Sequence, residues 1–374
     1  MPEKTTTTGL RGMEVAKTKI VKLDHELKTI LYRGYDLKDL AKKSCFEETA
    51  YLLIKGHLPV YRELREFSKC LLENQICQYT QEATKLKIIL DQIPRNAHPM
   101  NVLKFTVSFF GLTMNLNQKT EILAINLLAK ISSILRWLTN GDFKNGQSLK
   151  NESFTENTLR NITSKPLTPL AKKAFDVSLI LYAEHELAAS TFNARVTAST
   201  LSDYFSCILS AVGALKGPLH GGANEAVMQM LLEINDQKKT KKWIKNALLK
   251  KQKIMGFGHP IYKNGDPRSP IIESYAKKLS EEENELKWYE MSKIIEEILL
   301  REKGLYPNLD FYTATVYKLL GIPTKLFTPI FALSRLTGWT AHIIEQQTNN
   351  RIIRPGAKYT GPEKQIYIGM EGRN

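Results

Sequence analysis

Residues 326–346 read LFTPIFALSRLTGWTAHIIEQ, and this stretch indicates the fold class. We expect Thr328 to cap a helix there, with Pro329 in the first turn, because both residue types favour helix starts. Apolar side chains then recur at a helical spacing, which predicts one buried face. These side chains are Ile330, Phe331, Leu333, Leu336, Trp339 and Ile343.

The rest of the chain repeats this periodicity, and strand-like alternation is scarce. Thr29–Tyr35 is the best candidate for a small hairpin. The polar interval 138–168 predicts a mobile connection or a surface excursion. Helical patterns cover residues 46–56, 98–137, 169–190, 192–215, 226–234, 267–280, 285–303 and 310–320. The sequence therefore predicts an all-α protein.

Length and composition are those of a globular protein. The 374 residues suffice for two compact domains or one large one. A content of 43% hydrophobic and 24% charged residues excludes a disordered, collagen-like or disulfide-stapled chain. Because no stretch approaches about 18 uncharged apolar residues, we expect no membrane span, and we expect no signal peptide. Free thiols in a reducing cytosol are favoured, since no C-x-x-C motif joins Cys45, Cys70, Cys77 and Cys207.

The net charge of +15 predicts attraction to anions. Nucleic acid, an anionic membrane and a polyanionic metabolite all fit this charge. The most basic stretch, 236–253, favours a solvated amphipathic helix over a phosphate-attracting patch. In that helix we expect four side chains to face inward: Trp243, Ile244, Leu248 and Leu249.

Two glycine-rich turns carry histidines. In KGPLHGGAN (216–224), the glycines after His220 permit positive φ, although a capping turn with an incidental histidine fits equally. In GFGHP (256–260), Pro260 keeps His259 out of helical dihedrals, and the glycines would let a ligand approach the backbone. No strand–turn–helix unit surrounds this second turn, which excludes a dinucleotide-binding motif.

Charged residues at helix starts give further candidates. Asp266 and Pro267 predict a helix start with Arg268 in its first turn, where the positive end of the dipole disfavours a cation. That placement suggests an anionic ligand, although an exposed arginine costs little. Asp310 lies three residues after Pro307 and is either an acidic residue that favours a helix start or a general base.

Two arginines and one more histidine remain. Arg335 and Arg354 are able to bind carboxylates with both guanidinium nitrogens or to form salt bridges. His185 lies in an apolar pattern, where a lone histidine is more often a core residue than a ligand. No H-E-x-x-H or comparable spacing indicates a metal site.

Taken together, these segments resemble the citrate synthase superfamily over nearly the whole chain, apart from 138–168. The motifs of the C-terminal half are AEHELAASTFNARVTASTLSD (183–203), LKGPLHGGANEAV (215–227), KIMGFGHPIYKNGDPR (253–268), the stretch 305–346, and NNRIIRPGAKYTGP (349–362). Those of the N-terminal half are GLRG (9–12), YRGYDLKDLA (32–41), FEETAYLLIKGHLP (46–59) and IPRNAHPMNVL (93–103). The chain looks most like the bacterial 2-methylcitrate synthases.

The resemblance implies an all-α homodimer. Each subunit would have a large domain, residues 1–221 and 321–374, and a small domain, residues 222–320. The active site would lie in the cleft between the domains, and Arg354 would reach across the dimer to the partner's substrate.

The resemblance also implies residue roles. Asp310 would be the general base that removes the α-proton of an acyl-CoA thioester. His220 would hydrogen-bond the thioester oxygen, and His259 would polarise the ketone of oxaloacetate. Oxaloacetate would be bound by His185, Arg268 and Arg335. The CoA adenine would lie against the backbone of Lys253, Ile254, Met255, Gly256 and Phe257.

The implied reaction condenses propionyl-CoA with oxaloacetate and water to give 2-methylcitrate and CoA, and acetyl-CoA would also be accepted. One alternative is a citrate synthase that prefers acetyl-CoA. A remote alternative is a non-catalytic basic helical protein, for instance one that binds nucleic acid, although no helix-turn-helix, RNP or zinc-finger signature appears. We expect no permanent cofactor, no metal, no nucleic-acid or membrane partner, and a cytoplasmic location.

Overall fold

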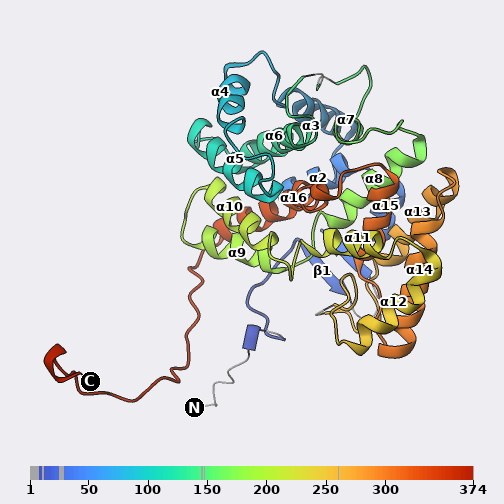
Figure 1. The fold of residues 1–374 in the computed structure, drawn as a ribbon. Coiled ribbons are helices and arrows are strands. Elements are labelled where there is room, and N and C mark those ends of the chain that lie inside the picture. The colour runs from blue at the N-terminus through green and yellow to red at the C-terminus, as the bar shows by residue number, and fades with distance from the viewer. Residues whose placement is uncertain are drawn as a thin grey trace.

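The computed structural model describes residues 8–10, 12–24, 29–144, 146, 148–259 and 261–373. These residues form mainly α-helices, numbered α1 to α16, with one small sheet (Figure 1). The predicted all-α class is confirmed.

The sheet lies near the N-terminus. It consists of β1 (Val21–Asp24), β2 (Thr29–Tyr32) and β3 (Tyr35–Asp36), paired antiparallel in that order. Arg33 and Gly34, with φ of 49° and 92°, form the two-residue turn between β2 and β3. The predicted hairpin is therefore confirmed, and β1 adds a strand that the sequence did not predict.

Helix α16 (Phe327–Thr348) runs through the interior, where other helices surround it (Figure 1). The six predicted apolar side chains are buried, but so are Arg335 and Thr337 on the other sides of the helix. The expectation of a single buried face is therefore wrong. Thr328 does not cap the helix, because the cap position is Leu326; the Thr328 hydroxyl instead bonds the carbonyl of Gly221 at 3.2 Å.

Further helices come from the first half of the chain. They are α1 (Leu37–Lys43), α2 (Phe46–Lys55), α3 (Tyr61–Glu73), α4 (Gln81–Leu90), α5 (Pro99–Thr113), α6 (Thr120–Asn140) and α7 (Phe154–Ile162). Helix α6 is long and apolar enough to span a membrane by length and composition alone. However, 67% of its most apolar 18-residue window is buried inside the protein, as in the core helix of a globular protein.

Helix α7 lies inside the polar interval that was expected to be a mobile connection or a surface excursion. That expectation is wrong for 153–162, because the polar side chains there cap a buried helix. Ser153 and Glu156 form a capping box. The buried Glu47 carboxylate accepts hydrogen bonds from the backbone N–H and hydroxyl of Thr155, at 3.0 and 3.1 Å.

Three helices follow, with breaks that the periodicity did not reveal: α8 (Pro169–Tyr182), α9 (Ala189–Ser199) and α10 (Tyr204–Leu215). The predicted helix 169–190 ends at Tyr182, so His185 lies in a connecting segment in which Glu186 has a φ of 53°. The predicted helix 192–215 is broken before Asp203. The Asp203 side chain accepts the Ser206 N–H and so starts α10.

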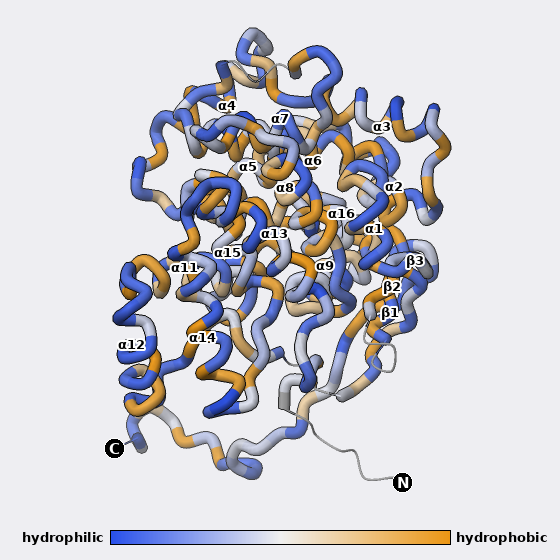
Figure 2. The backbone as a smooth tube through the Cα atoms, turned by 90° about the vertical axis from the view of Figure 1, so that its right-hand side faces the viewer, coloured by the Kyte–Doolittle hydropathy of each residue, from blue (hydrophilic) through white to orange (hydrophobic). Residues whose placement is uncertain are grey.

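The helices between residues 223 and 319 pack mainly against one another (Figure 1). They are α11 (Ala223–Ile234), α12 (Gln237–Leu249), α13 (Ser269–Glu282), α14 (Lys287–Lys303) and α15 (Leu309–Leu319). Figure 2 shows hydrophilic residues recurring along α12 and α14. Ile244 of α12 is buried as predicted, but Leu249 at its last position is 81% exposed, so its inward placement was wrong.

The chain leaves the helical body after α16. Residues 350–369 contain no helix or strand, and Figure 1 shows this segment extending away from the body. Several apolar side chains of this tail are exposed: Ile352, Tyr359, Ile366, Tyr367, Ile368 and Met370. The described residues also include three short 3-10 helices: Thr8–Leu10, Thr324–Leu326 and Met370–Gly372.

Candidate active site

Asp310 lies in the first turn of α15. Asn308 caps that helix by accepting the Asp310 N–H at 3.1 Å. Asn308 also donates its side-chain amide to the Gly258 carbonyl at 3.1 Å and its backbone N–H to the Gly256 carbonyl at 2.9 Å. One residue therefore fixes both the helix start and the glycine-rich turn beside it.

The surroundings of Asp310 make its carboxyl group a weak acid. The side chain accepts a hydrogen bond from the Tyr182 hydroxyl at 2.6 Å. Burial raises the pKa of Asp310 to about 6, although the Tyr182 bond and the charges of Arg268 and Arg335 act in the opposite direction. Such a carboxylate is ionised at neutral pH and more basic than an ordinary aspartate, which suits a general base.

His220 lies in the turn between α10 and α11. The predicted positive φ is wrong here: Gly222 has a φ of −70°, and Gly221 is not among the glycines with positive φ. Gly221 is required for close approach instead, since a Cβ there would lie 2.6 Å from the Leu215 carbonyl oxygen.

The hydrogen bonds of His220 indicate which ring nitrogen carries the proton. Its Nε2 lies 2.8 Å from the Ser190 hydroxyl oxygen, which also accepts the indole N–H of Trp339 at 3.1 Å. The serine proton has no other acceptor among the described residues, so it is donated to Nε2, and Nδ1 keeps the ring proton. Burial, followed by the charge of Arg335, lowers the pKa of His220 to about 4, so the ring is a neutral donor at pH 7.

His259 and His185 meet in one aromatic cluster with Tyr262. The ring centroids of the two histidines are 5.0 Å apart, and the Tyr262 hydroxyl lies 2.9 Å from His185 Nε2. The Ile261 backbone N–H donates to His259 Nδ1 at 3.1 Å, so a neutral His259 carries its proton on Nε2. Burial and the charge of Arg268 lower the pKa of His259 to about 4 and that of His185 well below its usual value.

The glycines of the 256–258 turn have positive φ, 83° at Gly256 and 74° at Gly258. A Cβ at Gly256 would lie 2.6 Å from a methyl group of Val227, so a larger residue would not fit. Phe257 follows with its ring packed against Phe311, at a centroid distance of 4.4 Å. The segment 253–257 predicted to hold CoA therefore lies next to the helix that carries Asp310.

Arg268 forms a buried ion pair with Asp266. Its Nε and Nη2 donate to the two carboxylate oxygens at 2.9 and 2.8 Å. Burial raises the pKa of Asp266, but Arg268 outweighs that effect and the net shift is downward. Arg268 is the cap residue of α13 rather than a first-turn residue, so it still lies at the positive end of the helix, where the Asp266 carboxylate offsets its charge.

Arg335 enters the site from the middle of α16 and is 1% exposed. Its Nε donates to the Tyr182 carbonyl at 2.6 Å, and its guanidinium lies 4.8 Å from the centroid of the Phe331 ring. Its buried Nη1 has no hydrogen-bond partner among the described residues. An unpaired buried guanidinium nitrogen is costly, and an anionic ligand would satisfy it.

Six of the predicted site residues lie close enough to interact electrostatically: His185, His220, His259, Arg268, Asp310 and Arg335. Arg354 is exposed and follows Ile353, whose N–H bonds the Ser199 hydroxyl at 3.0 Å at the start of the C-terminal tail. Among the described residues, no group of three or more His, Cys, Asp or Glu side chains is placed to hold a metal ion.

Sequence reasoning missed the residues that support this site. Tyr182 and Ser190 follow the pattern of core positions, so only their hydrogen bonds reveal them. Oε1 of the buried Glu184 lies 3.1 Å from His342 Nε2, and His342 Nδ1 lies 3.0 Å from Arg195 Nη1. The sequence signal for this network would have been three polar residues among apolar neighbours.

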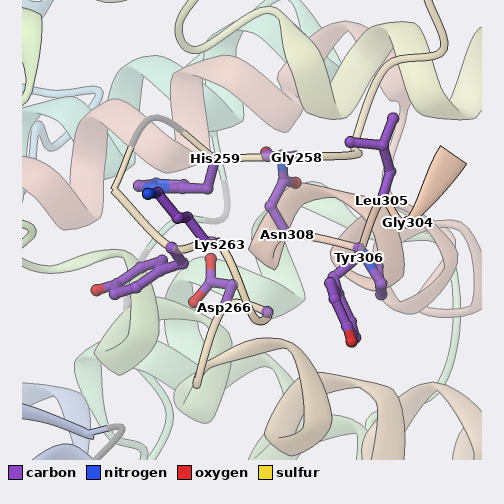
Figure 3. Close-up of a pocket in the computed structure, with 11 residues that line it drawn as sticks. Gly258, His259, Lys263, Asp266, Gly304, Leu305, Tyr306 and Asn308 are labelled. Atoms are coloured by element: carbon purple, nitrogen blue, oxygen red, sulfur yellow. The ribbon is translucent and has the colours of Figure 1, made fainter. Parts of the chain in front are cut away.

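A cavity of about 180 Å³ opens beside His259 (Figure 3). It is lined by Gly258, His259, Tyr262, Lys263, Gly265, Asp266 and residues 304–308. Asp310, His220 and Arg335 do not line it. The hydrogen bonds and charges around Asp310 therefore define the candidate site, and the cavity is open space at its edge, next to His259.

Comparisons with known proteins identify the family of this chain. The family model for the citrate synthase C-terminal domain matches residues 9–356. Citrate synthase 2 of Bacillus subtilis is 43% identical, over 99% of this chain and all of that protein. The 2-methylcitrate synthase of Shewanella oneidensis is 41% identical, over 98% of both chains.

A solved structure gives the same result for the fold. This structure is citrate synthase from Thermoplasma acidophilum in a ternary complex with carboxymethyl coenzyme A and oxaloacetate. Its TM-score against this chain is 0.86, and the match covers 98% of both chains at 32% identity. With a family match over most of its length and relatives above 40% identity, this chain belongs to the citrate synthase family.

Proposed function

We propose that the protein condenses an acyl-CoA with oxaloacetate and hydrolyses the resulting thioester. The observation that supports this function best is the combination of groups around Asp310. A carboxylate with a pKa of about 6 lies in one site with two neutral histidines and two buried arginines. This set of groups suits the enolisation of a thioester and attack on a ketone, because it combines a base, two neutral donors and two cations.

The first step is enolisation. Asp310 removes the α-proton of the acyl group, and the Nδ1–H of His220 donates to the thioester oxygen on which negative charge develops. A preorganised donor of this kind contributes about 3–4 kcal/mol to the stability of a transition state. Because the ring of His220 is neutral at pH 7, it donates this bond without adding a charge.

The second step forms the carbon–carbon bond. Arg268, Arg335 and His185 bind oxaloacetate, and the Nε2–H of His259 polarises its ketone. The enolate carbon attacks the ketone carbon, and the ketone oxygen takes the proton of His259 Nε2 to become a hydroxyl group. Water then attacks the thioester carbonyl carbon and the C–S bond breaks, so that this carbon remains in the product as a carboxylate and CoA leaves as the thiol.

We place the acyl-CoA between two domains: residues 1–221 with 321–374, and residues 222–320. The CoA adenine lies against the backbone of residues 253–257. Closure of the small domain would shield the enolate from water. The net charge of +15 would attract both anionic substrates.

We further propose a homodimer in which Arg354 completes the partner's site. In its own chain Arg354 is exposed and lies on an extended tail that carries exposed apolar side chains. A second copy of the chain would cover that tail. The protein needs no permanent cofactor, and a reducing, cytoplasmic location fits its four free cysteines.

Propionyl-CoA is the acyl donor that we propose, supported by the motifs shared with 2-methylcitrate synthases and by the 41% identical relative of that name. Acetyl-CoA is the second candidate, supported by the 43% identical citrate synthase. One methylene group changes the binding free energy by about 1–3 kcal/mol, so the two donors are compared by the ratio of their kcat/KM values.

The test is the release of CoA, followed with a thiol reagent, in the presence of oxaloacetate. A higher kcat/KM for propionyl-CoA is expected. A higher value for acetyl-CoA would make the protein a citrate synthase, and no release with either donor would refute the proposed reaction.

A further inference from the structure

Tyr182 connects two parts of the site that we assign to different substrates. It is the last residue of α8, and only 1% of it is exposed. Its hydroxyl lies 2.6 Å from Asp310 Oδ1, and its carbonyl accepts the Arg335 Nε–H at 2.6 Å. Its ring packs against Phe331 at a centroid distance of 4.3 Å. These contacts hold the Tyr182 hydroxyl in one position.

Asn224, in the first turn of α11, completes a chain of hydrogen bonds. Its amide nitrogen lies 2.9 Å from the Tyr182 hydroxyl, and the residue is fully buried. An ionised carboxylate only accepts hydrogen bonds, so the single hydroxyl proton of Tyr182 is donated to Asp310. The hydroxyl oxygen is then free to accept, and Asn224 donates to it.

The two carboxylate oxygens of Asp310 differ in their hydrogen bonds. Oδ1 accepts the Tyr182 hydroxyl, whereas no hydrogen bond to Oδ2 is found among the described residues. Three elements meet at this carboxylate: α8 with Tyr182, α11 with Asn224, and α15 with Asp310 itself. The bond therefore fixes the rotation of the carboxylate and leaves Oδ2 available.

We propose that Tyr182 and Asn224 are positioning residues that orient Asp310 so that Oδ2 receives the substrate α-proton. This inference rests on the proposed function, in which Asp310 is the base. The groups that act on the Asp310 charge are Tyr182 from α8, Arg335 from α16, and Arg268 and Asp266 from the segment before α13. Tyr317, on α15 itself, also interacts electrostatically with Asp310. Of these, only Tyr182 donates a hydrogen bond to the carboxylate.

The expected effect of Tyr182→Phe follows from that bond. The variant keeps the ring and the carbonyl that holds Arg335, so the KM for oxaloacetate should stay within about two-fold of the wild-type value. At pH 8, where Asp310 is ionised, kcat should fall by about 10- to 100-fold, the effect of one hydrogen bond to a charged group. The acid limb of the kcat/KM profile should move up by about one pH unit, because the Tyr182 bond lowers the pKa of Asp310.

Tyr317→Phe is the matched control. Tyr317 is also buried, and its hydroxyl lies 3.1 Å from Ser178, so this contact joins the same two helices, α8 and α15. Its hydroxyl does not bond Asp310. Both variants lose one buried hydroxyl contact between α8 and α15, but only Tyr182→Phe should move the acid limb. Equal pH profiles in the two variants would overturn the proposal.

A second readout does not depend on turnover. Carboxyl ¹³C NMR of aspartate-labelled protein, with the Asp310 signal assigned by its loss in Asp310→Asn, gives the pKa of that carboxyl directly. The pKa should rise in Tyr182→Phe and rise less in Asn224→Ala. An unchanged pKa in Tyr182→Phe would refute the hydrogen-bond chain, even if the wild-type protein releases no CoA and the proposed function fails. An unchanged pKa in Asn224→Ala would refute the part assigned to Asn224.

Discussion

Replacing Asp310 with Asn should stabilise the fold while it abolishes the reaction. Burial raises the pKa of Asp310 from 3.8 to about 6. A group whose pKa is raised by folding favours the folded state below its unfolded pKa and loses that contribution as the pH rises through the folded pKa. At pH 8 the ionised carboxylate therefore lowers the free energy of unfolding.

The size of this effect follows from the two pKa values. A rise of about two pH units corresponds to about 3 kcal/mol. The side chain is partly exposed, so we expect a gain of about 1–3 kcal/mol at pH 8 for Asp310→Asn. Asparagine retains an oxygen that can accept the Tyr182 hydroxyl proton, so this contact remains. At pH 4 the folded wild-type carboxyl is protonated, and the gain should largely disappear.

The assay is urea unfolding followed by circular dichroism at pH 8 and pH 4, at one fixed protein concentration because subunit association adds to apparent stability. Asp266→Asn is the control with the opposite sign. Asp266 pairs with Arg268 inside the protein, and loss of one partner of a buried pair costs about 3–5 kcal/mol. A folded Asp310→Asn protein that is less stable than wild type at pH 8 would refute the reasoning.

Three further outcomes are expected. Ser190→Ala removes the hydroxyl that fixes the His220 tautomer, so kcat/KM for the acyl-CoA should fall about 10-fold or more in CoA-release assays, with the protein still folded by circular dichroism. Gly338→Ala would place a Cβ 2.1 Å from Glu184 Oε2, so denaturant unfolding should show a loss of about 1–3 kcal/mol, and an unchanged midpoint would contradict the packing. The pH profile of kcat/KM should fall as the pH decreases through about 6, because Asp310 must be ionised, and a profile that stays flat to pH 5 would contradict its role.

The sequence predicts the helices well where apolar periodicity dominates. The core of α16 and the helix 46–55 follow directly from it. The errors arise where a polar side chain competes with that pattern. Asp203 starts a new helix inside an apolar run, and Ser153 caps a buried helix inside a polar one. Both helix starts depend on local side-chain hydrogen bonds that periodicity does not report.

The site shows the same division. His220, His259 and Asp310 stand out in the sequence because glycine, proline and helix-start residues surround them. Tyr182 and Ser190 do not, because each occupies an apolar helical position and acts through one hydroxyl. Their roles depend on contacts between residues 128 and 30 positions apart in the chain, which only the fold brings together.

The central claim is that Asp310 is the base in a condensation of acyl-CoA with oxaloacetate. The most direct measurement compares CoA release by wild-type protein and by Asp310→Asn, each with propionyl-CoA and with acetyl-CoA. We predict release by the wild type that requires oxaloacetate, and a loss of at least about 10²-fold in kcat for the variant, the smaller end of what general-base catalysis contributes. Undiminished turnover by a folded Asp310→Asn protein would contradict the account.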